Sequence, residues 1–134
     1  MSDINLELLG KYLESYGWKY EIHEGEFIIL FKGEQSDAEF HLIMSTSENW
    51  IGLTIWPFVF LPIGKEDAAI KFICKKNFDL KMVRLGMTEK GEISLCADLS
   101  FIDLTEKQFH NALDVLSYYA DVLYPELVAF WEKE

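Results

Sequence analysis

The alternation of apolar and polar positions divides the first third of the chain into one helix and a series of strands. Over residues 3–16, leucines and tyrosines recur every three or four residues, which predicts an amphipathic helix that ends at Gly17. Strict alternation predicts strands over 18–23 and 38–44, and the more apolar run 26–32 predicts a strand inside the sheet. Because short turns separate these strands, we expect an antiparallel meander.

The longest apolar stretch is residues 50–63, which read WIGLTIWPFVFLPI. It is too short for a membrane-spanning helix, and Pro57 interrupts its middle. We expect a fourth strand over 50–57 that is buried on both faces and leads into a loop. The alternative is a strand whose end exposes an apolar patch to a partner.

The pattern of the next segment predicts a second helix and then a hairpin. Residues 65–76 have acidic residues in the first turn and lysines in the last, as the helix dipole favours. Ile70 and Cys74 lie off the main apolar stripe, so we expect this helix to be covered on more than one side. Alternation over 80–87 and 92–99, around a glycine turn, predicts two more strands.

A long helix is predicted to complete the chain. It begins at a capping box, Thr105–Gln108, and apolar residues then recur at helical spacing. Pro125 has no backbone N–H, so we expect a kink or a restart near Tyr124. The predicted order is helix, four strands, helix, two strands, helix. This order indicates an α+β fold, a two-layer domain over 1–134 in which helices cover an antiparallel sheet.

Charge and cysteine content narrow the class of partner and the compartment. A nucleic-acid backbone and an anionic membrane would both repel a net charge of −11, so we expect neither as a partner, whereas a basic protein is permitted. Residues 65–90 are mildly basic and form either a solvated helix face or a surface that pairs with an acidic face of a second copy. Cys74 and Cys96 lack metal-type spacing, so we expect free buried thiols and a cytoplasmic protein. Residues 1–10 do not have the pattern of a secretory signal.

The sequence contains no pattern that predicts catalysis or a bound cofactor. His23 and His41 are expected on solvated faces of two strands that flank a third, about 10 Å apart, which is too far for one zinc ion. His110 has no metal-binding partner on its helix, so we expect no metal site. Neither cysteine follows a glycine turn at a helix start, and nucleophile-elbow, Walker and dinucleotide motifs are absent from the sequence. We therefore expect a protein that is not an enzyme.

Binding through surface side chains is the function that remains. The aromatic residues of the central stretch are too many to be internal in a chain of this size, although core packing explains most of them. Those that are exposed are predicted to form apolar pockets with an acidic rim, into which a basic or amphipathic partner segment is steered. The predicted partner-binding residues are Trp50, Trp56, Phe58 and Phe60.

Several features of the second half occur together in a known family. A Leu61-Pro62 exit from a strand precedes a short helix ending at Asn77, then the hairpin VRLGMTEKGEISLCADL and a helix with YYADVLYPEL. In these features, and in element order along nearly the whole chain, the sequence resembles the YbjN-domain family, which is similar in fold to type III secretion chaperones. The resemblance implies a small acidic bacterial cytosolic protein without a cofactor, usually a homodimer. The predicted dimer contacts lie on the second helix and its neighbouring hairpin, and they are Ile70, Cys74 and Met82.

Three functions are consistent with these observations. The leading interpretation is a non-enzymatic protein-binding module, chaperone-like or regulatory. A second is an acidic immunity or inhibitor protein that neutralises one toxin through tight, salt-sensitive binding. A third is a small-molecule-binding domain, which requires a concave cavity lined with polar groups.

Overall fold

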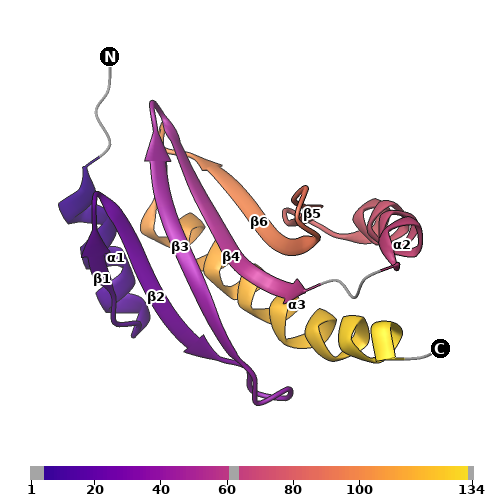
Figure 1. Cartoon of the computed structure of the whole chain (residues 1–134). Coiled ribbons are helices and arrows are strands. Elements are labelled where there is room, and N and C mark those ends of the chain that lie inside the picture. Colours follow the sequence, from indigo (N-terminus) through magenta and orange to yellow (C-terminus); the bar gives the residue numbers. More distant parts are fainter. Residues whose placement is uncertain (1–4, 61–63, 133–134) are drawn as a thin grey trace.

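The structure is a computed structural model that describes residues 5–60 and 64–132. It is shown in Figure 1. The helices are α1 (Leu6–Tyr16), α2 (Glu66–Asp79) and α3 (Glu106–Glu132). The strands are β1 (Glu21–His23), β2 (Glu26–Lys32), β3 (Glu39–Ser47), β4 (Trp50–Phe60), β5 (Arg84–Met87) and β6 (Glu92–Ser100). Leu61-Pro62, the strand exit in the family resemblance, lies outside the described residues.

All six strands form one antiparallel sheet in the order β1-β2-β3-β4-β6-β5. The first four strands make the predicted meander, and the second hairpin joins it through β6, which pairs with β4. Helices α1 and α3 lie against one face of this sheet, and α2 lies beside the edge strand β5 (Figure 1). The α+β architecture expected from the sequence is confirmed.

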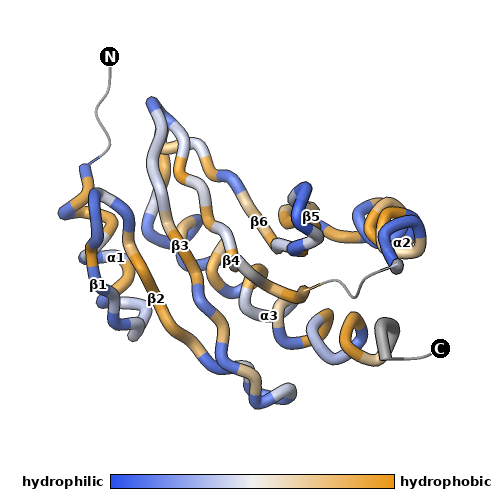
Figure 2. Tube along the Cα trace, viewed as in Figure 1, coloured by the Kyte–Doolittle hydropathy of each residue, from blue (hydrophilic) through white to orange (hydrophobic). Residues whose placement is uncertain are grey.

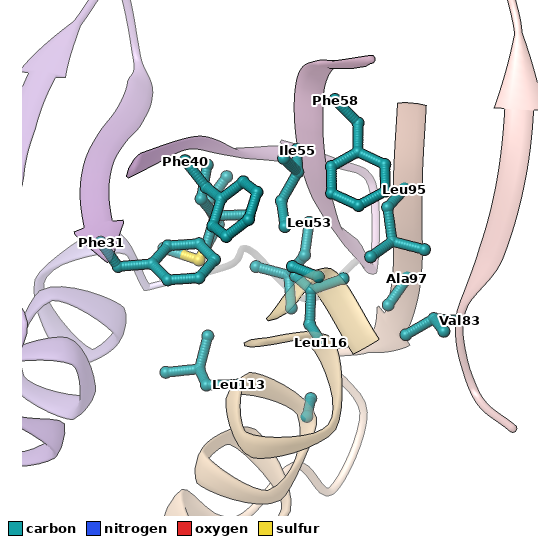
Figure 3. Close-up of a cluster of buried hydrophobic side chains, with 14 of the residues drawn as sticks. Phe31, Phe40, Leu53, Ile55, Phe58, Val83, Leu95, Ala97, Leu113 and Leu116 are labelled. Atoms are coloured by element: carbon teal, nitrogen blue, oxygen red, sulfur yellow. The ribbon is translucent and has the colours of Figure 1, made fainter. Parts of the chain in front are cut away.

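The core lies between the sheet and α3. Alternate residues of the central strands point toward the helix and are fully buried, for example Leu53, Ile55 and Leu95. They meet Leu113 and Leu116 of α3, as Figure 3 shows. The hydrophilic positions in Figure 2 gather at the turns that join β2 to β3 and β3 to β4. Burial of this apolar surface is the main force that holds the helix layer on the sheet.

Local signals in the sequence account for most helix and turn boundaries. Gly17 ends α1 in the left-handed region, with φ of 100°, as predicted. The capping box of α3 is also present, because Thr105 N–H donates to Gln108 Oε1 at 3.0 Å and Gln108 N–H donates to Thr105 Oγ1 at 3.1 Å. At the start of α1, the side chain of Asn5 accepts a hydrogen bond from Leu8 N–H at 3.1 Å, a cap that the sequence analysis missed.

Two elements continue through a proline where an interruption was expected. Strand β4 continues past Pro57 because its register with β6 shifts there. Ile55 pairs with Leu95 and Val59 pairs with Ile93, so β4 has two more residues than β6 between these pairs. Pro57 lies inside this bulge, where its missing N–H removes no ladder bond. Helix α3 continues through Pro125, so the helix does not restart there, although a proline at this position removes a backbone hydrogen bond.

Asn77 has a different role from the helix cap that the sequence suggested. Helix α2 continues past it to Asp79. Its side-chain amide instead bonds the backbone of Leu85 in β5. This contact holds α2 at the edge of the sheet.

Candidate protein-binding surfaces

The face of the sheet opposite α1 and α3, here called the outer face, is not covered by any helix within the described residues (Figure 1). One row of paired residues crosses it from β2 to β5: Ile28, Ile43, Thr54, Cys96 and Arg84. Arg84 Nη1 lies 2.9 Å from Asp98 Oδ2 on the same face. Leu30 is exposed beside this row. Along this row the outer face therefore changes from apolar at β2 and β3 to charged at β5.

Three of the four predicted partner-binding residues are exposed on this face. Trp50, Trp56 and Phe60 of β4 are 54%, 40% and 65% exposed. About 20 Å separate the first two along the strand, from the rise per residue. These three residues, here called the β4 line, form a row of separate apolar side chains and not a single pocket.

The fourth residue, Phe58, is placed differently from the expectation. It is only 4% exposed and lies in the core. Its ring centroid is 5.7 Å from that of Phe40 and 6.0 Å from that of Tyr124, and Figure 3 shows it among the buried side chains. The bulge in β4 turns it inward between Trp56 and Phe60, so it is not a surface residue.

A second exposed apolar surface lies on α2. The predicted dimer residues Ile70 and Met82 are each about half exposed and Cys74 is exposed. Phe78 was not predicted to belong to this surface, and it is 88% exposed. Its signal was present, because residues 70, 74 and 78 follow one another at the four-residue spacing of a helix face. Together these four residues are called the α2 surface below.

The other side of α2 faces the protein. Ala69 and Ile73 are buried there, as the predicted stripe requires. Lys76 Nζ lies 2.6 Å from Glu126 Oε1 of α3. Figure 2 shows both hydrophobic and hydrophilic positions on this helix. Ala69, Ile73 and Lys76 attach it to the rest of the protein, so its exposed apolar side chains are not needed for that attachment.

A serine, a histidine and a glutamate meet where α1 and α3 cross. Ser15 Oγ lies 2.6 Å from Glu106 Oε2 and 3.1 Å from His110 Nε2. The same Nε2 lies 2.9 Å from the carbonyl oxygen of Tyr12, which can only accept, so this nitrogen carries the proton. A hydrolytic triad needs the serine and the acid on opposite ring nitrogens. This cluster therefore links the two helices and does not activate the serine.

The remaining histidines lie as predicted. His23 and His41 are exposed on β1 and β3, which flank β2. Within the described residues, no group of three or more His, Cys, Asp or Glu side chains could hold a metal ion. Among the helices described in the structure, none is long and apolar enough to cross a membrane.

A cavity of about 340 Å³ lies between the end of α1, the loop that joins β2 to β3, and the middle of α3. We call it the α1–α3 cavity. Its walls include Trp18, whose ring stacks on Phe31 with centroids 4.8 Å apart, and Tyr118 of α3. Tyr16 contributes a hydroxyl that donates to Asp114 Oδ1 at 2.5 Å. No local pattern in the chain predicted this cavity, because its walls come from segments that are far apart in the sequence.

The loop wall of the cavity is held by a buried carboxylate. Asp121 accepts hydrogen bonds from Gln35 N–H at 2.9 Å and from Ser36 N–H at 2.8 Å. Burial alone would raise the pKa of Asp121, but these donors outweigh it and hold the pKa below its usual range. Gly33 lies against the same carboxylate, which leaves no room for a Cβ atom there.

Comparisons with known proteins place this fold. No curated protein sequence matches the chain. The crystal structure of YbjN from E. coli is 14% identical with a TM-score of 0.69, over 92% of this chain and 94% of that chain. A chain of the ExsC–ExsE complex is 17% identical with a TM-score of 0.60, over 89% of this chain and 90% of that chain. The fold thus resembles that of a type III secretion chaperone, as expected.

A match between the chain and a family sequence model shows the family. The YbjN family model, described as "Putative bacterial sensory transduction regulator", matches residues 5–129. This range includes the whole sheet, α1, α2 and most of α3. The chain therefore belongs to the YbjN family.

Proposed function

We propose that this protein is a non-enzymatic protein-binding module, chaperone-like or regulatory, which binds a segment of a partner protein across the outer face. The observation that carries the proposal is the β4 line, three exposed aromatic residues on a sheet face that no described helix covers. Exposed aromatic groups of this kind are typical of interaction sites and contribute much of the binding energy there.

Charge and fold similarity support a protein as the partner. A net charge of −11 favours a segment with basic residues. The ExsC–ExsE complex, one chain of which has a similar fold, is an assembly of two different proteins. The free thiols Cys74 and Cys96 fit a cytoplasmic location.

We also propose that a second copy of the chain covers the α2 surface. Its three helical members lie four residues apart, so an antiparallel two-fold pairing centred on Cys74 would set Ile70 of one copy against Phe78 of the other. Such an arrangement buries the most exposed aromatic side chain of the described residues without using the β4 line. The dimer then has two outer faces available for partners.

The test of partner binding compares two variants of one immobilised protein. Wild type, Trp50→Ser/Trp56→Ser and the control Ile22→Ser are exposed to lysate of the organism that encodes the chain, and retained proteins are identified by mass spectrometry. Ile22 is a suitable control because it is 53% exposed and pairs with the inward-facing Phe27 on another part of the sheet.

We expect wild type and the control to retain one protein at near-equal amounts and the double variant to lose it. The retained protein is then purified and its affinity is measured at about 0.05 M and 0.5 M salt, which changes the range of charge interactions. Unchanged affinity of the Trp50→Ser/Trp56→Ser variant would contradict the proposed role of the outer face.

A further inference from the structure

The α1–α3 cavity combines aromatic walls with negative charge. Trp18 is half-buried with one face on Phe31, and Tyr16 meets it edge-on, with centroids 4.9 Å apart and planes at 88°. On the α3 side, the ring of Tyr118 is 61% exposed at the cavity wall. The exposed ring of Tyr118 offers a negative π surface to a cation that enters the cavity.

Carboxylates dominate the charged groups of the same cavity. Among the described residues, Glu34, Asp114 and Asp121 line it together with one cation, Lys32. Lys32 Nζ lies 3.1 Å from Asp37 Oδ1, so its charge is already paired. The carboxylate of Asp121 already accepts hydrogen bonds from the loop N–H groups. Glu34 is exposed, and its carboxylate has no ion pair within the described part of the chain. A negative charge in the cavity is thus left without a partner.

The same carboxylates act on the hydroxyl of Tyr16. Its pKa is raised above the ordinary value, first by burial, then by its hydrogen bond to Asp114 and the charge of that group, and further by the charge of Glu34. Two carboxylates therefore act on one point inside the cavity. A cation placed there would be stabilised by the same two groups.

We propose that the α1–α3 cavity binds the guanidinium group of an arginine that a polypeptide partner presents. A guanidinium group is flat, so it can lie on the exposed ring of Tyr118 while its N–H groups donate to Glu34 and Asp114. An anion would be repelled by these carboxylates. The inference rests on the proposed function, because it gives a chemical identity to part of the partner.

The test is a titration of ¹⁵N-labelled protein with N-acetyl-arginine methylamide, followed by NMR. The reporters are the indole N–H of Trp18 and the backbone amides of Gln35 and Ser36. N-acetyl-citrulline methylamide is the matched neutral probe, because it keeps the shape of the side chain and lacks its charge. We expect saturable shifts with the arginine probe and none with the citrulline probe at the same concentration.

Variants assign the binding to particular carboxylates. Glu34→Gln and Asp114→Asn should each weaken binding about three- to fivefold, as expected for partly exposed charge pairs. Glu89→Gln, in the exposed turn between β5 and β6, should leave it unchanged. Glu34 lies in an exposed loop, so its variant carries the test even where Asp114→Asn disturbs Tyr16. Three results would each overturn the inference. They are the absence of a saturable shift, an equal response to the citrulline probe, and unchanged binding in the Glu34→Gln/Asp114→Asn double variant.

A second comparison identifies the source of the guanidinium group. An arginine within a capped Gly-Gly-Arg-Gly-Gly peptide should bind more tightly than agmatine, the free small cation. Agmatine binding as tightly as the peptide would overturn the assignment to a polypeptide. These probes do not involve Trp50 or Trp56, so failure here and failure of partner capture by the outer face are separate results.

Discussion

The side-chain amide of Asn77 pairs with both backbone groups of Leu85. Its Nδ2 donates to the carbonyl oxygen of Leu85 at 3.0 Å, and its Oδ1 accepts from the N–H of Leu85 at 2.8 Å. Leu85 belongs to the edge strand β5, so the amide occupies the place of a neighbouring strand. An unpaired strand edge is prone to pair with other chains. Asn77 therefore satisfies this edge and attaches α2 to it at the same time.

Asn77→Ala should lower the free energy of unfolding by about 1–3 kcal/mol, since it leaves a partly buried N–H and carbonyl group without partners. Urea denaturation measures this change. Asn111→Ala, at an exposed position of α3, is the matched control and should change stability by less than about 0.5 kcal/mol. Equal stability of the two variants would show that the amide contributes nothing at the sheet edge.

Gly33→Ala should destabilise the protein by about 1–3 kcal/mol, as overpacking does elsewhere. The added Cβ atom would collide with Asp121 Oδ1 and lie 2.5 Å from Ser36 Oγ. The carboxylate cannot move away without losing its loop donors. Gly86→Ala is the control, because its Cβ atom would lie 3.4 Å from Ser94 Oγ, within ordinary contact. Thermal melting that ranks the two variants the other way would contradict this packing.

Asp121→Asn should remove a pH-dependent part of the stability. The pKa of Asp121 is lower in the folded protein than its ordinary value of 3.8, so its contribution is present above that value and is lost as the pH falls through the folded pKa. The difference between wild type and variant should therefore be largest near neutral pH and shrink below about pH 4. Urea denaturation at pH 7, 5, 4 and 3 follows it, with the exposed turn variant Glu89→Gln as control. A difference that stays constant with pH would argue against a charged Asp121 holding the loop.

Phe78→Ser should weaken self-association if the α2 surface is the dimer contact, because it removes the most exposed aromatic side chain of that surface. Sedimentation velocity over a range of concentrations measures the change. In a Cys96→Ser background, mild oxidation should also give a covalent dimer through Cys74, since the proposed two-fold axis passes near it. Tyr118→Ser, at a similarly exposed aromatic residue of α3, should leave association unchanged. A wild-type protein that stays monomeric at all concentrations would rule the dimer out.

Phe58→Ala and Trp56→Ala should separate stability from binding. Phe58 is buried, so its truncation should cost about 3–5 kcal/mol. Trp56 is partly exposed, so its truncation should lower the free energy of unfolding by less than about 2 kcal/mol, in line with the smaller area that it buries. Circular dichroism melts give the stability, and the affinity for the captured partner gives the binding. The reverse order of stability would mean that the bulge in β4 orients these two side chains differently.

Sequence alone was sufficient where structure follows local periodicity. The stripe of α3, the capping box at Thr105 and Gln108, and the hairpin glycines depend on residues within a few positions of one another, and all were predicted. The pairing of β6 with β4 was not predicted, because it joins the meander to the second hairpin through contacts that no local pattern encodes. The inward direction of Phe58 also escaped prediction, since the bulge interrupts the alternation between Trp56 and Phe60.

The candidate surfaces also differ in how far the sequence predicts them. The α2 surface could have been completed from spacing alone, because Phe78 continues the series of Ile70 and Cys74. The α1–α3 cavity could not, since it joins Trp18 to Asp114 and to the loop at Gly33 through tertiary packing. Trp18 was visible in the sequence only as one more aromatic residue, and Asp114 as one of many carboxylates.

The bulge in β4 also limits how this strand can vary in length. Its two extra residues equal one period of a strand, so Ile55 and Val59 both remain on the buried face and Phe60 returns to the side of Trp50. An insertion or deletion of one residue there would exchange the two faces, and would bury Phe60 while it exposes Val59. An insertion of two residues would keep Val59 on the buried face and Phe60 on the side of Trp50. Related chains should therefore tolerate even-numbered insertions between Ile55 and Val59 and exclude odd-numbered ones.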